Sequence, residues 1–286
     1  MRRLPLLIAV SVAPAAAATM VHAQTLREYS STRQDHGESR LAATVQYAGG
    51  TLNLVPAPAG ILYALRLTYD ADRFAPVARF DPAVPRLTLG TEALARSGGV
   101  RVSHRGTPPA ATIGLGTRAD LDLDIELGAA EATLELGGIR ISRLKLQTGA
   151  SKTAVRFSES NPIRCSGAEF SAGAAELMVT GLGYARCSEV DFNGGIGKVT
   201  LDFSGRWTGP MHLDAQMAVG ELVLRLPKRA GIKLELDKFL ASFAPAGLVR
   251  SADGRTWSST GFENAPQQLV VEVETAFGGV TVEWID

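Results

Sequence analysis

Residues 190–203 read VDFNGGIGKVTLDF, a short run of glycines between two segments in which apolar and polar residues alternate. Strict alternation is typical of a β-strand with one buried face, because strand side chains point to opposite faces with a period of two. The glycines between the segments favour a tight turn, since glycine adopts positive φ without a Cβ clash. The stretch therefore predicts a strand, a turn and a second strand.

The same pattern recurs through the second half of the chain. It is found in residues 123–136, 144–157, 168–180, 213–226, 234–243 and 271–284. We take the last small residue of each turn as an anchor, which gives Ala130, Ser151, Ala175, Gly197, Gly220, Ala241 and Gly278. The first six anchors are 21, 24, 22, 23 and 21 residues apart, and the last follows after 37. Repeats of about 20 to 50 residues are typical of folds in which similar units stack.

Positions at a fixed distance from the anchor keep one chemical character. Five residues before it stand Ile125, Leu146, Phe170, Phe192, Ala215, Leu236 and Val273, and the positions two, four and six after it are mostly apolar as well. Leu201, four residues after its anchor, is therefore predicted to point into a core, and Thr200 to point outward. One unit cannot bury its own apolar face, so each is predicted to be stable only against its neighbours.

One position after the anchor, the charge alternates in sign from unit to unit. The residues are Glu131, Lys152, Glu176, Lys198 and Glu221. Paired strands lie about 4.8 Å apart, so stacking in this register makes each residue the neighbour of an opposite charge. Exposed ion pairs contribute only about 0.2–1 kcal/mol each. The column therefore indicates the register of the stack more than it explains its stability.

These observations predict an all-β fold, a parallel β-solenoid of roughly 22-residue coils with two strands per coil. Residues 118–286 are predicted to form the solenoid domain, with an excursion at 250–266, where Ser, Gly and Asp are frequent and the spacing lengthens. Residues 24–117 are predicted to be an N-terminal segment of the same kind. Within it, residues 73–117 are rich in Pro and Gly and do not fit the register, so irregular first coils or a cap are expected there.

The first 23 residues predict an export signal. Arg2 and Arg3 precede an apolar run at 4–12, and Val21-His22-Ala23 ends in a cleavage site after Ala23. The run is shorter than the roughly 20 apolar residues that span a bilayer, and no later segment is predicted to span one. A periplasmic or secreted protein is expected. Because the chain carries 29 basic and 29 acidic residues, no overall charge favours nucleic acid as a partner.

Two further stretches connect this pattern with a known family. RLAATVQYAGGTLNLVPAP at residues 40–58 fits the same register on Gly50. Near the C-terminus, residues 227–231, 234–243, 254–262 and LVVEVETAFGGVTVEW at 269–284 follow one another. In these units the sequence resembles the bacterial toast-rack or "putative adhesin" family, which includes the extracytoplasmic domains of LiaF-like, cell-wall-active antibiotics response proteins. The resemblance implies a structural module and carries over no catalytic residue. Membrane helices of the LiaF-like kind are not predicted, so a role beside a membrane kinase is not expected.

Few residues are candidates for chemistry. Asp120, Asp122, Asp124 and Glu126 alternate with apolar residues and share one strand face, which would suit either a calcium ladder or, as we favour, a solvated face. His36, His104 and His212 lie far apart, so no zinc site is predicted. The glycines at 194–197 suggest a phosphate-binding loop, but the required spacing fails at Phe192 and Val199. No catalytic, cofactor-binding or metal-binding residue and no cofactor is predicted.

Two functions remain open from the sequence. The favoured one is a non-enzymatic exported scaffold or adhesin-like interaction module of the bacterial envelope, with an envelope protein or a surface glycan as partner. The alternative is a polysaccharide-binding or polysaccharide-processing β-helix protein, in which Trp207, Trp257 or Tyr184 would stack on sugars. The other possibility for these aromatic residues is packing in the core. The oligomeric state is not predicted.

A disulfide is predicted between Cys165 and Cys187. Each lies ten residues before its anchor, so the two occupy equivalent places in consecutive units, about 4.8 Å apart, within the range that a disulfide joins. Export to an oxidising compartment would close it. The mass of the denatured, unreduced protein after treatment with an alkylating label should show no labelled thiol. Two labelled thiols would refute the bridge.

Overall fold

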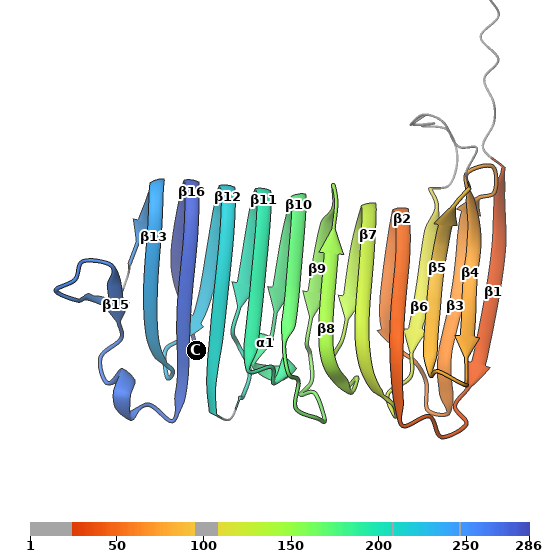
Figure 1. The fold of residues 1–286 in the computed structure, drawn as a ribbon, viewed down its shortest axis with the longest axis horizontal. Coiled ribbons are helices and arrows are strands. Elements are labelled where there is room, and N and C mark those ends of the chain that lie inside the picture. The colour runs from red at the N-terminus through yellow and green to blue at the C-terminus, as the bar shows by residue number, and fades with distance from the viewer. Residues whose placement is uncertain (1–24, 95–107, 208, 246) are drawn as a thin grey trace, which may run out of the picture.

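The computed structural model describes residues 25–94, 108–207, 209–245 and 247–286, so the predicted export signal at 1–23 lies outside the described residues. The fold is all-β, which confirms that part of the prediction. In Figure 1 the strands stand side by side along the longest axis, from β1 at one end to β13 and β15 at the other. The strands are β1 (Leu26–Gln34), β2 (Arg40–Pro56), β3 (Ile61–Asp70), β4 (Phe74–Asp81), β5 (Arg86–Ala93), β6 (Ala110–Leu115), β7 (Asp120–Glu135), β8 (Ile141–Thr148), β9 (Lys152–Arg156), β10 (Ala168–Thr180), β11 (Glu189–Asp202), β12 (Gly209–Pro227), β13 (Gly231–Ala244), β14 (Val249–Arg250), β15 (Thr256–Ser258) and β16 (Gln267–Ile285).

Among the residues that the structure describes, helix is confined to short segments. They are α1 (Leu182–Ala185) and the 3-10 helix η1 (Phe262–Asn264). Within the part of the chain that the structure describes, no helix has the length and apolar character needed to cross a membrane.

Neighbouring strand–turn–strand units, which we call layers, pair in parallel and in the predicted register. The anchors Ala175 of β10, Gly197 of β11 and Gly220 of β12 are direct partners. The charge column is in register too, with Lys152 Nζ 3.5 Å from Glu176 Oε2 and Lys198 Nζ 2.8 Å from Glu221 Oε2. The fixed distances from the anchor therefore describe real lateral columns of side chains.

The apolar columns form the core between the two strand segments of each layer. Phe170, Phe192 and Phe203 are among the largest side chains that are fully or almost fully buried. Leu201 is buried as predicted, but the prediction that its neighbour Thr200 faces solvent is wrong, because Thr200 is only 4% exposed. Thr200 lies between strands on both sides and is flanked by Val223 of β12, which is also buried.

The order of the layers differs from their order in the chain at the C-terminal end. β16 pairs with β12 on one side and with β13 on the other, so the last strand lies between two earlier ones (Figure 1). Arg225 of β12 accordingly forms an ion pair with Glu283 of β16, with 2.8 Å between Nε and Oε2. The longer step of 37 residues before Gly278 contains β14, β15 and η1, which separate β13 from β16 along the chain.

Residues 249–264 close the outer side of β13. β15 pairs with β13 in the antiparallel direction, and β14 pairs with β15. The buried Trp257 packs edge-on against Phe243, with 4.9 Å between ring centroids. The predicted excursion at 250–266 thus contains strands that cover the end of the stack, as terminal units of repeat folds must.

Residues 73–117, which did not fit the register, contain a layer in two pieces. β5 pairs in parallel with the first part of β2, and β6 with its second part. Residues 95–107, between these strands, lie outside the described residues. β4, β3 and β1 then add antiparallel neighbours. The domain division at 117 remains a prediction, and β2 and β7 pair across it along most of their length.

The turns of adjacent layers are in close contact. A Cβ added to Gly197, Gly220 or Gly278 would lie within 2 Å of the carbonyl oxygen of the neighbouring anchor, at 1.9, 1.9 and 1.8 Å respectively. All three residues also have positive φ, at 148°, 140° and 125°. Only glycine satisfies both conditions, so these turns set how closely the layers approach.

Two alanine substitutions separate the effect of the close contact with the neighbouring backbone from the effect of the positive φ. Gly220→Ala should lower the free energy of unfolding by about 3 kcal/mol or more, because it combines positive φ with a clash against backbone. Gly261→Ala should cost only about 1 kcal/mol, since Gly261 has φ 79° but no atom near its would-be Cβ. Chemical denaturation of both variants measures the difference, and equal losses would contradict the close approach of the turns.

Candidate functional site

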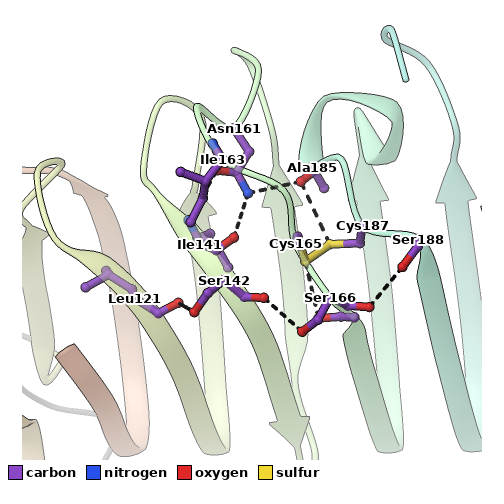
Figure 2. The surroundings of a disulfide bond; sticks show 11 residues. Leu121, Ile141, Ser142, Asn161, Ile163, Cys165, Ser166, Ala185, Cys187 and Ser188 are labelled. Carbon is purple, nitrogen blue, oxygen red and sulfur yellow. Dashed lines mark hydrogen bonds between the residues drawn. A yellow bond between two sulfur atoms is a disulfide. The ribbon is translucent and has the colours of Figure 1, made fainter. Parts of the chain in front are cut away.

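The predicted disulfide is confirmed and lies at the return side of the layers of β10 and β11. Figure 2 shows Cys165 and Cys187 joined between neighbouring layers, with 4.2 Å between their Cα atoms. Both cysteines are buried, at 3% and 4% exposure, and the chain has no other cysteine. The bridge therefore fastens two layers and leaves no thiol for chemistry.

Polar side chains around the bridge serve the same layers. Asn161, 2% exposed, donates from Nδ2 to the carbonyl oxygens of Ile141 and Ala185 and accepts the Ile141 amide (Figure 2). Ser166 and Ser188, nine residues before their anchors, each donate a hydroxyl to the carbonyl oxygen of the equivalent serine one layer earlier. These hydroxyls are committed to holding layers together.

The acidic run that suggested a calcium ladder faces basic residues. Asp120 accepts a hydrogen bond of 2.7 Å from Arg140 Nε, and Asp122 and Asp124 are paired in the sheet with Arg143 and Lys145. Arg140 thus pairs with Asp120, and basic residues of the next strand stand beside the two carboxylates that follow it. Asp122 and Glu126 are exposed, which fits the solvated face that the sequence favoured.

The remaining candidates for metal or phosphate chemistry are dispersed. His212 Nε2 lies 3.9 Å from a Glu272 carboxylate oxygen, His36 is at the far end of the stack, and His104 lies outside the described residues. Within the described ranges, no three His, Cys, Asp or Glu side chains are placed to hold a metal ion. The glycines at 194–197 form the turn of β11, where Gly195 faces the Gly173 carbonyl of the next layer.

Five carboxylates form a column that the sequence reading missed. Six residues before the anchors stand Glu169, Asp191, Asp214, Glu272 and Glu235, each paired laterally with the next. Burial, followed by the charges of Asp214, Glu189 and Glu169, raises the pKa of Asp191. Like charges directly opposite one another destabilise a sheet, so this column costs folding free energy.

The most distinctive surface is a row of exposed apolar side chains along the edge of the stack where the turns lie. We call this edge the turn edge and the row the ridge. It consists of Ile196, Val219, Phe239, Leu240 and Phe277, with exposures of 62, 40, 75, 64 and 46%. Ile196 pairs with Val219, Val219 with Phe277, and Phe277 with Leu240, so the ridge is continuous across layers. The rings of Phe239 and Phe277 meet edge-on with 6.0 Å between centroids.

The sequence contained a signal for the ridge. Four of its members occupy the position directly before the anchor, where earlier layers have Ala129, Ala150 and Ala174. A change from alanine to large apolar residues in an outward column is not explained by the core. The insertion of β16 could not be foreseen, and it alone brings Phe277 between Val219 and Leu240.

The turn edge is also hollowed beside the ridge. One hollow of about 770 Å³ is lined by residues of β2, β5, β7, β8 and β10, and a second of about 540 Å³ by residues of β12, β13 and β16. Both are lined by Asn193 of β11. We call the first hollow the turn-edge groove.

The aromatic residues considered for sugar stacking do not offer exposed faces. Trp207 and Trp257 are 4% and 8% exposed and belong to the core. Tyr184 is partly buried and packs against the same core. Sugar stacking on these tryptophans is therefore wrong, because both serve to fill the stack.

Comparison with known proteins gives a family match. The model described as the N-terminal domain of toast_rack, DUF2154, matches residues 23–180. No curated protein matches the chain.

Solved structures with a similar course of the chain also exist. A "putative cell adhesion protein" from Clostridium sporogenes ATCC 15579 is 14% identical, with 91% of this chain and 100% of that chain covered and a TM-score of 0.48. A "putative adhesin" from Bacteroides fragilis NCTC 9343 is 9% identical, with 91% and 98% covered and a TM-score of 0.41. At these scores and identities the likeness supports no inference about function.

The carboxylate column predicts an unusual response to pH. The raised pKa means that the folded protein disfavours the charged form of Asp191, which lowers the free energy of unfolding at neutral pH. This loss disappears below about pH 4, because the carboxyl group is then protonated in the folded and in the unfolded chain. Asp191→Asn should raise the free energy of unfolding at pH 7 by about 0.2–1 kcal/mol, and by less at pH 3. Asp122→Asn, opposite Arg143, is the control and should lower it at pH 7. Denaturation at both pH values decides, and a loss of stability at pH 7 in Asp191→Asn would contradict the account.

Proposed function

This chain belongs to the toast-rack family, and we propose that it is a non-enzymatic, adhesin-like interaction module of the bacterial envelope. We propose further that its layers form a parallel β-solenoid of roughly 22-residue coils with two strands per coil. The lateral pairing of Ala175 with Gly197 and of Gly197 with Gly220 supports this architecture.

The ridge is the observation that carries the proposal. Contiguous exposed apolar surface is costly in water and marks interaction sites when it is retained. Four of the five ridge residues lie in the column directly before the anchors, where earlier layers have alanine, so the core does not require large side chains there. Phe239, 75% exposed, and Leu240, 64% exposed, are the two most exposed members of the ridge, and both lie on β13.

The bonds that the polar side chains form support a non-enzymatic module. The two cysteines form a disulfide, and the hydroxyls of Ser166 and Ser188 donate to backbone carbonyls. Asp120 is paired with Arg140. These groups are used to connect layers, which is a structural task.

An exported location, periplasmic or secreted, is part of the proposal. It is supported by the disulfide, because such bonds persist in oxidising compartments, and by the signal predicted at residues 1–23. Partners within reach of such a protein are envelope proteins and surface glycans. The alternative of a polysaccharide-processing β-helix loses its basis in Trp207 and Trp257, since both are buried.

Photo-crosslinking in the producing cells tests the ridge as the interaction surface. A photoreactive residue at position 240 should give a reproducible adduct, whereas the same residue in place of Thr133, which is exposed on β7 away from the ridge, should not. Phe277→Ser should reduce the yield at position 240 about fivefold or more, because truncation of a central apolar contact weakens binding strongly.

The adduct mass identifies the partner, and twice the mass of the chain would indicate a second copy. Equal labelling at positions 240 and 133, or a yield unchanged by Phe277→Ser, would contradict the proposal.

A further inference from the structure

Two arginines lie next to the disulfide on the return side of the stack. Arg164 and Arg186 each directly precede a bridged cysteine, eleven residues before the anchors of β10 and β11. Cys165 and Cys187 pair laterally in the parallel direction, and Figure 2 shows their bridge between the layers. The disulfide therefore holds the two arginines at equivalent places in neighbouring layers.

Neither arginine has a carboxylate partner among the residues that the structure describes. Arg140 occupies the same place one layer earlier and is paired with Asp120, with 2.7 Å between Nε and Oδ1. The lysines of β8, β9 and β11 are likewise paired with glutamates of the next layer. Like charges in adjacent strands destabilise a sheet unless opposite charges offset them. Arg164 and Arg186 therefore lack the balancing charge that these other cations have, and an anion from outside the fold would supply it.

Arg186 is also held in a backbone conformation that glycine adopts more easily. Its φ is 56°, and no other described residue except glycine has a positive φ. Arg186 caps the C-terminus of α1, a place where glycine is common. Its Nη1 donates a hydrogen bond of 3.0 Å to the carbonyl oxygen of Asn161, which orients the guanidinium group. Strained residues of this kind are concentrated at functional sites, so the backbone points to a binding role for this side chain independently of its charge.

Arg164 and Arg186 line a common hollow of about 390 Å³, which we call the arginine hollow. Its other described lining residues are Cys165, Cys187, Ser188, Trp207, Gly209 and Pro210. None of these residues is acidic. The two cysteines are bonded to each other, and the Ser188 hydroxyl donates to the Ser166 carbonyl oxygen. Among the described lining residues, charge therefore comes from the two arginines alone.

The unpaired positive charge is confined to two layers. Asp120 and Asp122 line the adjoining hollow of about 700 Å³, which Arg164 also borders. On the other side, the next layer has Gly209 at the place of the arginines. A long polyanion laid along the stack would meet carboxylates or uncharged residues beyond these two layers. The arrangement therefore favours a compact anion.

We propose that the arginine hollow binds a phosphate group, either free or carried by a small organic molecule. Each guanidinium group presents a planar fork of N–H donors that matches two oxygens of an anion. One fork is enough for the two oxygens of a carboxylate, whereas a phosphate has further oxygens for a second arginine. The hollow is several times larger than the roughly 30 Å³ that a water molecule takes up in the liquid, so a group attached to the phosphate would fit as well. This site is separate from the ridge and goes beyond the proposed function.

Titration calorimetry of the whole mature protein in phosphate-free buffer tests the proposal. The probes are inorganic phosphate and glycerol 3-phosphate, with acetate and glycerol as controls. At least one phosphate probe should bind with a dissociation constant of about 1 mM or lower, and acetate should bind at least about tenfold more weakly. Tighter binding of glycerol 3-phosphate would assign the site to a carried phosphate, and tighter binding of inorganic phosphate to the free ion. Binding of neither phosphate probe at about 10 mM, or equal binding of acetate or glycerol, would overturn the proposal.

Side-chain variants locate the binding. Arg164→Gln and Arg186→Gln should each weaken phosphate binding about tenfold, because each removes a charge-assisted hydrogen-bond donor. Arg79→Gln removes the same charge from β4, where Arg79 is paired with Glu92, and should leave the affinity unchanged. Melting temperatures show that the variants fold. Unchanged affinity in both hollow variants, or an equal loss in Arg79→Gln, would overturn the assignment.

The two proposals fail separately. Phe277→Ser changes the ridge and should leave the affinity for phosphate unchanged. An arginine hollow that binds no phosphate while position 240 still crosslinks overturns only the phosphate site. Phosphate binding without any specific crosslink at position 240 overturns only the ridge as the partner surface.

Discussion

The close approach of successive turns is the constraint on which the structure depends. The carbonyl of one anchor lies where the Cβ of the next would be at Gly197, Gly220 and Gly278, so the layers are held at backbone contact distance along this edge. The alternation of core and surface residues fixes the lateral register of these layers, because a slip by one residue would turn every core side chain to the opposite face. Core, ion pairs and disulfide all follow from the same register.

Because the layers share one register, residues at the same distance from their anchors lie side by side and form a continuous surface. A residue at one distance from its anchor is repeated in the neighbouring layers, so Gln147 becomes part of a polar row and Phe277 part of an apolar one. The order of β12, β16 and β13 is essential here, because it brings Phe277 beside both Val219 and Leu240. Ridge and groove share the turn edge, whereas Cys165, Cys187 and Asn161 join layers on the return side.

Much of this could be predicted from the sequence, because lateral columns depend only on distance from the anchor. Cys165 and Cys187 were paired in this way, and the neighbours Lys198 and Glu221 were found by their charges. The segments that connect one layer to the next have no fixed distance from the anchor, so the sequence did not predict whether Trp207 is buried. The apolar columns did not predict the position of β16 in the sheet either, since every layer presents apolar residues at the same distances from its anchor. Charged groups distinguish the observed order, since Arg225 pairs with Glu283 and His212 lies beside Glu272.

Engineered disulfides between layers test the central claim, the lateral register and the order of the last layers, most directly. Asp214 is paired with Glu272, and Glu272 with Glu235, so Asp214 and Glu235 lie two layers apart. Neighbours in the sheet are within the span of a disulfide, and next-nearest neighbours, at about twice 4.8 Å, are not. Intact mass and peptide mapping without reductant should therefore show a new bridge in Asp214→Cys with Glu272→Cys, and none in Asp214→Cys with Glu235→Cys. A bridge in the second pair and none in the first would contradict the account.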